Sequence, residues 1–109
     1  MYNFNLEKGE SLYSVFDEVL VKQGNNQKVV SVALTDKRIL FLDFVSREPY
    51  ETLKGAQASN YIKIKEVFYY RNLNEIKEVK SSTFYEIKFN DSSFVEFDNE
   101  ELFKALKEL

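Results

Sequence analysis

The chain has 109 residues, of which 44% are hydrophobic and 30% are charged, and its formal net charge is -3. This size suits one domain, and the composition is that of a folded globular chain rather than a disordered one. The sequence contains no cysteine and no histidine, which excludes disulfides, thiolate metal sites and the commonest general base near neutral pH. We therefore expect a single domain over residues 1–109 that is not an enzyme and needs no cofactor.

The ends and the apolar runs of the sequence bear on its location. The first ten residues carry neither a basic region nor an apolar stretch, so no secretory signal is expected. No apolar run approaches the roughly 18 residues that a membrane span needs. These features predict a cytoplasmic protein, with a peripheral position at the inner face of the membrane as the open alternative.

Short runs of β-branched and aromatic residues, separated by polar turns, predict seven strands after a lead-in of residues 1–10. The segment 73–80 fits a helix as well as a strand, because Leu73, Ile76 and Val79 are spaced by three. It is assigned as a strand because an alternating run follows it closely. The expected strands cover residues 11–22, 28–34, 38–44, 61–70, 73–80, 84–89 and 93–97.

Two long predicted strands alternate clearly enough to assign faces. Strict alternation within a strand predicts that residues two apart share a face. In 11–22, one face is expected to carry Tyr13, Val15, Val19 and Val21. In 61–70, one face is expected to carry Ile62, Ile64, Phe68 and Tyr70, and the other Tyr61, Lys63, Lys65, Val67 and Tyr69.

The C-terminal residues 99–109 predict an amphipathic helix. Asp98 is expected to cap its N-terminus, with Glu101 three residues later as in a capping box. Lys104 and Lys107 place positive charge near the C-terminal end, where it favours the helix dipole. A helix this short needs a docking surface, and its apolar stripe consists of Leu102, Phe103, Leu106 and Leu109.

Several sequence features together resemble the small bacterial PH-like domains, the GRAM/PH-like group of the pleckstrin-homology superfold. They are Leu6 with Gly9-Glu10, the hairpin LTDKRILF at 34–41, the spacing of 73–80, and the close FDNEELFKALKEL. The resemblance implies a mainly β fold: a bent, partly open barrel of seven antiparallel strands capped by one C-terminal helix. Members of the superfold bind phosphoinositides, peptides, phosphopeptides or other proteins, so the resemblance does not select the ligand.

The resemblance also implies where a ligand would bind. In lipid-binding members the headgroup lies at the open end of the barrel, which here corresponds to the loops 23–27, 45–60 and 90–92. The cations available there are Lys22, Lys28, Arg47 and Lys54. Nearby acidic residues, such as Glu48, Glu51 and Asp91, weaken a phosphate site, which needs several converging cations.

The basic pair of the LTDKRILF hairpin falls at the opposite end of the expected barrel. We expect Thr35 and Asp36 to supply the hydrogen bonds of the turn. Lys37 and Arg38 are then expected to be solvated charges at the entry of the next strand.

Three other patterns leave alternatives open. The basic and aromatic residues of 61–71 are either a stacking surface for single-stranded nucleic acid or a solvated strand face. The carboxylates Asp43, Asp91, Glu96 and Asp98 have no spacing typical of a calcium loop. The aromatic surplus is either an exposed interface patch or is covered by the helix and loops; its members are Phe16, Phe44, Tyr50, Tyr69, Phe84 and Phe94.

The sequence therefore predicts a protein-interaction or self-association module, with a partner protein or a second copy as its ligand. An unpaired strand edge or the aromatic patch would make the contact. The alternative is a membrane-surface or lipid-headgroup adaptor that acts through the loops 23–27 and 45–60 and makes weak contact with anionic lipid. The acidic net charge speaks against a nucleic-acid partner.

Overall fold

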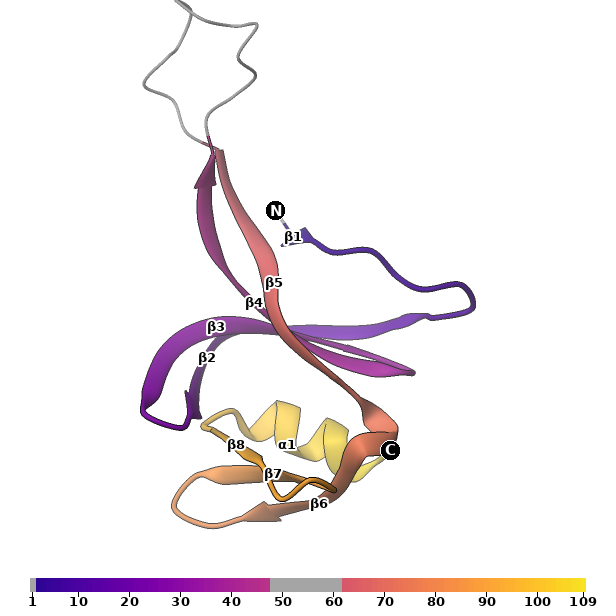
Figure 1. Ribbon diagram of the computed structural model, residues 1–109, viewed down its shortest axis with the longest axis vertical. Helices are drawn as coiled ribbons and strands as arrows, with labels where there is room; N and C mark the ends of the chain where they lie inside the picture. Colours follow the sequence, from indigo (N-terminus) through magenta and orange to yellow (C-terminus); the bar gives the residue numbers. More distant parts are fainter. Residues whose placement is uncertain (1, 48–61) are drawn as a thin grey trace, which may run out of the picture.

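The structure is a computed structural model, and it describes residues 2–47 and 62–109. Within these residues, eight strands form one strongly twisted sheet, and one C-terminal helix, α1 (Glu100–Lys107), packs against it (Figure 1). The strands are β1 (Tyr2–Asn3), β2 (Leu12–Gln23), β3 (Asn26–Thr35), β4 (Arg38–Arg47), β5 (Ile62–Asn72), β6 (Ile76–Ser81), β7 (Tyr85–Phe89) and β8 (Phe94–Phe97).

The order of the strands across the sheet is β1-β5-β4-β3-β2-β8-β7-β6. All neighbours are antiparallel except β1, which runs parallel to β5 with Tyr2 opposite Lys65. The mainly β fold with a C-terminal helix is confirmed. The expectation of seven antiparallel strands is wrong: within residues 2–47 and 62–109 the lead-in adds an eighth strand, β1, which is parallel to its neighbour, and the sheet does not close into a barrel. A two-residue strand leaves no alternation in the sequence, which is why β1 was not predicted.

The seven predicted strands are all present, but bulges change the faces of two of them. In β2 the register with β3 shifts between Phe16 and Val19, where Glu18 has a positive φ of 55°. One extra residue at this bulge reverses the alternation. Val19 and Val21 therefore lie in the main core, whereas Val15 packs on the opposite face of the sheet. Tyr13 is exposed and lies at a further register shift, between Leu12 and Ser14. The expectation that this tyrosine and the three valines share one face is wrong.

Another bulge lies in β5. Phe41 pairs with Tyr69, but Leu42 pairs with Val67, so Phe68 is the extra residue. Tyr69 packs on the main core and Val67 on the opposite side of the sheet. Strict alternation is therefore wrong here as well.

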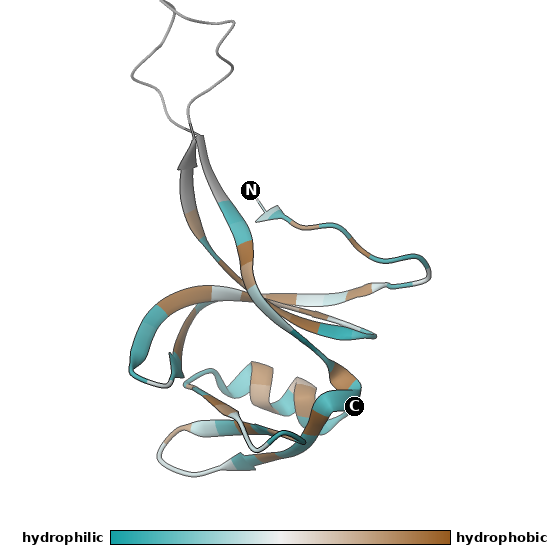
Figure 2. Ribbon diagram, viewed as in Figure 1, coloured by the Kyte–Doolittle hydropathy of each residue, from teal (hydrophilic) through white to brown (hydrophobic). Residues whose placement is uncertain are grey.

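The sheet buries apolar side chains on both faces. The main core lies between the sheet and α1 and includes Phe41, Phe89 and Phe97. A smaller cluster on the other face contains Ala33, Leu40 and Leu42, with Phe4, Val15 and Val67 packed against it. Figure 2 shows hydrophobic and hydrophilic residues alternating around α1, whose Leu102 and Leu106 are buried. The N-terminal segment thus covers a sheet face that would otherwise expose apolar side chains.

The helix begins one residue later than the sequence predicts. Asn99 is its N-cap, and its side-chain oxygen accepts a hydrogen bond from the Leu102 backbone N–H at 2.8 Å. Asp98, the predicted cap, instead accepts a hydrogen bond from the backbone N–H of Leu20 at 2.9 Å. The prediction of Asp98 as the cap is wrong because a long-range contact with β2 takes its carboxylate. Lys104 and Lys107 do lie in the last turn, as expected.

The ambiguous segment 73–80 is partly helical and partly extended. Leu73–Glu75 form a 3-10 turn, and β6 follows directly. The Glu75 side chain accepts a hydrogen bond from the Asn72 backbone N–H at 2.8 Å, which closes a capping box. This turn directs β6 away from β5 and toward β7.

Candidate functional site

The hairpin LTDKRILF holds a buried ion pair rather than a solvated basic pair. The Arg38 guanidinium donates to both carboxylate oxygens of Glu10, from Nη2 at 2.7 Å and from Nε at 2.9 Å. The side chains of Arg38 and Glu10 are 9% and 0% exposed. The expectation that Arg38 is solvated is wrong, because Glu10, 28 residues earlier, folds back onto it.

The remaining partners of Glu10 complete a closed polar network. The Thr35 hydroxyl donates to Glu10 at 2.5 Å, and the Glu7 backbone N–H donates at 2.7 Å. The hydrogen bond from Arg38 is the main reason that the pKa of Glu10 falls from 4.5 to about 2, and Thr35 lowers it further. Arg38 also donates to the Asn5 carbonyl at 2.9 Å. The network therefore fastens the N-terminal segment to the sheet.

Of the two predicted turn residues, Thr35 supplies hydrogen bonds within the turn, as expected, whereas the Asp36 side chain bonds to a residue 25 positions earlier. The Thr35 hydroxyl oxygen accepts hydrogen bonds from the backbone N–H groups of Lys37 and Arg38 at 3.0 and 2.8 Å. Asp36 accepts a hydrogen bond from the Ser11 backbone N–H at 2.9 Å. Lys37 donates to the Lys8 carbonyl at 3.3 Å, so this end of the hairpin holds the N-terminal segment.

A second polar cluster ties β1 to the same sheet face. The Tyr2 hydroxyl donates to Asp17 at 2.7 Å, and Lys65 Nζ donates to Asp17 at 2.9 Å and to Ser31 at 2.6 Å. The fully buried Ser31 hydroxyl donates to Asp17 at 2.6 Å. Hydrogen bonds from Ser31, Tyr2 and Lys65 lower the pKa of Asp17 to about 2. The charges of Asp17 and Lys65 are therefore paired with each other inside the chain.

Of the four predicted ligand cations, the structure describes the side chains of Lys22 and Lys28, and these two do not lie together. Lys22 lies over the ring of Phe84, at 4.2 Å. Lys28 lies over Phe68, at 4.5 Å, and its Nζ is 3.2 Å from an Asp43 oxygen. Because Lys22 pairs with Gln27, the neighbour of Lys28, the two lysines point to opposite faces of the β2–β3 ribbon. The Arg47 side chain and Lys54 lie outside the described residues.

The cations of 61–71 that the structure describes have partners inside the chain. Lys65 is bound as above, and Arg71 donates to Glu75, Asp91, Tyr69 and Ser93. Tyr61 and the Lys63 side chain lie outside the described residues. The bulge at Phe68 also breaks the single basic and aromatic face that alternation predicts.

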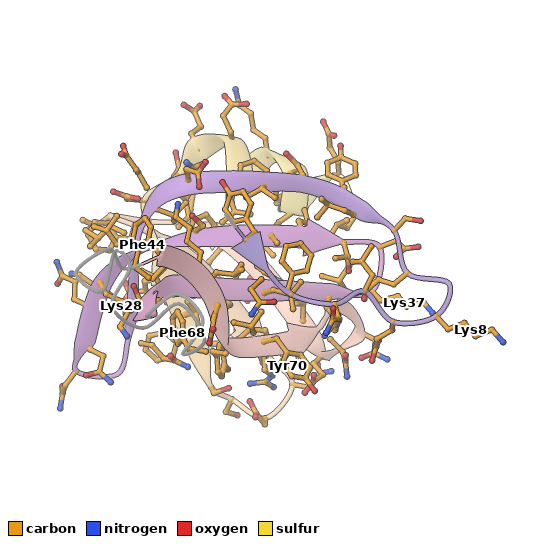
Figure 3. All side chains as sticks on the ribbon, turned by 90° about the horizontal axis from the view of Figure 1, so that it is seen from above. Lys8, Lys28, Lys37, Phe44, Phe68 and Tyr70 are labelled. Atoms are coloured by element: carbon orange, nitrogen blue, oxygen red, sulfur yellow. The ribbon has the colours of Figure 1, made fainter. Side chains whose placement is uncertain are left out.

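The aromatic surplus is partly covered. Phe16 and Tyr69 pack against the main core, and Phe84 is half-buried below Lys22. Phe44 and Phe94 are 60% and 45% exposed, and Tyr50 lies outside the described residues. Figure 3 shows Phe44, Phe68 and Lys28 near one end of the sheet and Lys37 and Lys8 at the other.

The last strand of the sheet, β6, has a free edge. Within the described residues its only strand neighbour is β7. An unpaired edge presents backbone N–H and C=O groups to whatever lies beside it. Lys107 of α1 reaches this edge, because its Nζ donates to the Val79 carbonyl at 3.4 Å. The edge is therefore accessible to a donor that comes from outside the sheet.

A groove of about 580 Å³ runs between β6 and the C-terminal part of α1. Both apolar and charged side chains line it. The apolar lining comes from Leu73, Ile76, Val79, Leu106 and Leu109, and the charged lining from Lys77, Glu78 and Lys107. The sequence suggested a strand edge as a contact, but it did not identify β6, because which strand lies at the edge depends on the order of all eight.

Neither a metal-binding cluster nor a membrane-crossing helix is found within residues 2–47 and 62–109. No group of three or more acidic side chains lies close enough together to hold a metal ion. None of the helical structure in this part of the chain is long and apolar enough to cross a membrane.

Comparison with solved structures identifies the architecture. The chain is similar to the Vps36 N-terminal PH domain, with a TM-score of 0.59 over 95% of this chain and 81% of that chain. The chain has a PH-like fold. The sequence identity is 15%, so the similarity of the PH-like chain to this domain is one of fold. No protein-family model matches the sequence, and no curated protein matches it. The bacterial origin implied by the sequence resemblance stays a prediction.

Proposed function

We propose that this PH-like chain is a non-enzymatic protein-interaction module that binds its partner along β6. The observation that carries the proposal is the β6 edge, which is unpaired among the described residues and has a groove of apolar and charged side chains beside it. An extended segment can add to such an edge, where main-chain hydrogen bonds give affinity and side-chain pockets give specificity. A cytoplasmic location suits this role and stays a prediction.

The geometry of the groove favours an extended segment over a globular surface. Ile76 and Val79 are half-buried on the side of β6 that faces the main core, and Leu106 of α1 lies across the groove from them. A segment that pairs with β6 would place every second side chain toward these apolar residues. Its other side chains would face solvent.

The proposal predicts that a single backbone N–H of β6 is needed for binding. Peptides selected by display on the folded chain should bind Ser81→Pro at least about tenfold more weakly than wild type, since proline removes one edge hydrogen bond and its ring obstructs the incoming strand. Ser81→Ala is the matched control, because it keeps the N–H, and should bind like wild type. Equal binding of selected peptides to wild type and to Ser81→Pro would place the interaction elsewhere.

A second candidate is a membrane-surface or lipid-headgroup adaptor acting through the loops 23–27 and 45–60. The observation that favours it is the pair of exposed aromatic rings at this end, Phe44 and Phe68, which lie below Lys65 and Lys28. Aromatic rings and lysines commonly occur together at membrane interfaces. The candidate cations remain Lys22, Lys28, Arg47 and Lys54.

Vesicle flotation separates the two functions. If the adaptor function holds, the chain should float with anionic phosphatidylserine vesicles, and added salt should release it. Reversing the charges of Lys22, Lys28 and Arg47 together should abolish flotation. Flotation that is absent at low salt would contradict the adaptor function and leave the β6 function unaffected.

A further inference from the structure

We propose that the partner at β6 is a second copy of this chain, paired β6 to β6 in antiparallel orientation about a two-fold axis at Val79. The inference rests on the proposed function, because it uses the same edge and names its occupant. It is carried by the direction of the backbone groups along β6 and by the order of charges on its exposed face.

The backbone of Val79 faces the free edge. Ser82 N–H donates to the Phe84 carbonyl at 2.9 Å, so the backbone groups of Ser82 face β7. The pairing of β6 with β7 is regular from Glu78 to Ser81, and its register shifts only before this stretch, between Ile76 and Glu78. Residues of an antiparallel ladder alternate between facing their partner strand and facing away. Counting back from Ser82, the backbone groups of Lys80 and Glu78 face β7, and those of Ser81 and Val79 face outward.

Two further hydrogen bonds agree with this direction. The Phe89 N–H donates to the Ser93 carbonyl at 2.9 Å, so Phe89 faces β8 and its neighbour Lys88 faces β6. Lys88 is the cross-strand partner of Glu78. The Val79 carbonyl accepts a hydrogen bond from Lys107, as a group on the free side of β6 can. Val79 therefore has backbone groups available to a second strand.

Only some registers of a symmetric strand pair bring the outward-facing backbone groups together without placing like charges opposite each other. Outward-facing residues must lie opposite outward-facing residues, so the two-fold axis passes through a residue and not between two residues. An axis at Glu78 sets this carboxylate opposite itself, and an axis at Lys80 sets two ammonium groups opposite each other. An axis at Val79 sets Val79 opposite itself and Glu78 opposite Lys80 of the second copy.

The Val79 register also extends the charge pattern of each sheet. Within one chain, Glu78 lies opposite Lys88 and Lys80 lies opposite Glu86, with Lys80 Nζ 3.5 Å from a Glu86 oxygen. In the dimer, four side chains would lie side by side across four strands: Lys88 and Glu78 of one copy, then Lys80 and Glu86 of the other. Their charges would alternate in sign. Opposite charges at directly facing positions stabilise strand pairs, and like charges destabilise them.

Lys107 would compete with the second copy. Its ammonium group occupies the Val79 carbonyl, which the Val79 N–H of the other strand needs. A lysine at a sheet edge is a common guard against strand pairing. Replacing Lys107 by alanine should therefore lower the dissociation constant of the pair severalfold.

The test is the oligomeric state of the full chain, measured by sedimentation equilibrium over a range of concentrations. Wild type should form a dimer. Glu78→Lys and Lys80→Glu should each raise the dissociation constant at least about tenfold, because like charges then face each other at two symmetric positions. An equimolar mixture of these two variants should dimerise again, since one chain then carries only lysines and the other only glutamates at the two facing positions. Glu101→Lys, a charge reversal on the exposed face of α1, is the control and should dimerise like wild type.

Three outcomes would overturn the β6 pairing: a monomer at all concentrations, a dimer that survives both charge reversals, or no recovery in the mixture. Circular dichroism of each variant shows that it is folded. Binding of selected peptides, lost in Ser81→Pro, tests the edge separately. A monomer that still binds such peptides contradicts self-pairing alone, whereas a monomer without edge-dependent binding contradicts the proposed function as well.

Discussion

Replacing Glu10 by glutamine should lower the free energy of unfolding by about 3–5 kcal/mol, the usual cost of leaving one member of a buried ion pair alone. The Arg38 guanidinium would stay buried without its charge partner, and the Thr35 hydroxyl would lose a charged acceptor. Urea denaturation followed by circular dichroism measures the change. Glu7→Gln is the matched control, because Glu7 lies 3.8 Å from Arg38 but is 58% exposed, and surface pairs contribute little.

A double variant tests whether the unpaired charge of Arg38 causes the loss of stability. Replacing Arg38 by methionine in the Glu10→Gln background should recover part of the lost stability, because it removes the unpaired charge. If Glu10→Gln and Glu7→Gln cost equally little, the network does not fasten the N-terminal segment as we describe. If the double variant is less stable than Glu10→Gln, the charge of Arg38 is not the source of the loss.

Acid should destabilise the chain between about pH 5 and pH 2. The pKa of Glu10 is lowered from 4.5 to about 2 in the folded chain, so its contribution is fully present above pH 4.5 and is lost as the pH falls through that range. The loss from Glu10 is on the order of 3 kcal/mol. Asp17, whose pKa is also about 2, should add a smaller loss, because half of its side chain is exposed.

Urea unfolding at a series of pH values measures this dependence. Glu10→Gln has no carboxylate to titrate at this position, so its stability should change less between pH 5 and pH 2 than that of wild type. Asp36→Asn is a control, since it removes an exposed carboxylate that is also near the hairpin. A wild-type profile as flat as that of Glu10→Gln would contradict the buried pair.

Local patterns in the sequence predicted most of the fold. The positions of β2–β8, the turns at Gly24 and Asp36, and the C-terminal helix follow from alternation, turn residues and the apolar stripe. The details that were missed depend on residues far apart in the sequence. Asp98 bonds to Leu20, 78 residues away, and so does not cap the helix next to it.

The bulges at Glu18 and Phe68 show a second limit. One extra residue reverses which side chains face the core, and neither residue carries a signal of its own. Glu18 has a positive φ, which glycine adopts far more readily than glutamate. Phe68 looks like any other strand residue. The faces of β2 and β5 therefore could not be assigned correctly from alternation.

The sequence predicted the type of binding site but not its position in the fold. The sequence indicated that an unpaired strand edge or an aromatic patch would bind a partner. Identifying β6 requires the strand order, and identifying Val79 requires the direction of its backbone groups. Both depend on pairing between strands, whereas the cations that the family resemblance emphasised lie over aromatic rings or beside carboxylates where the structure describes them.

Hydrogen exchange at β6 tests the central claim most directly, which is that this edge is the binding surface. In the free chain the Val79 and Ser81 amides should exchange quickly, because they face solvent, and the Lys80 amide should be protected by its bond to β7. At concentrations where the chain associates, or with a selected peptide bound, Val79 and Ser81 should become protected. If they still exchange quickly while amides elsewhere gain protection, the partner binds another surface.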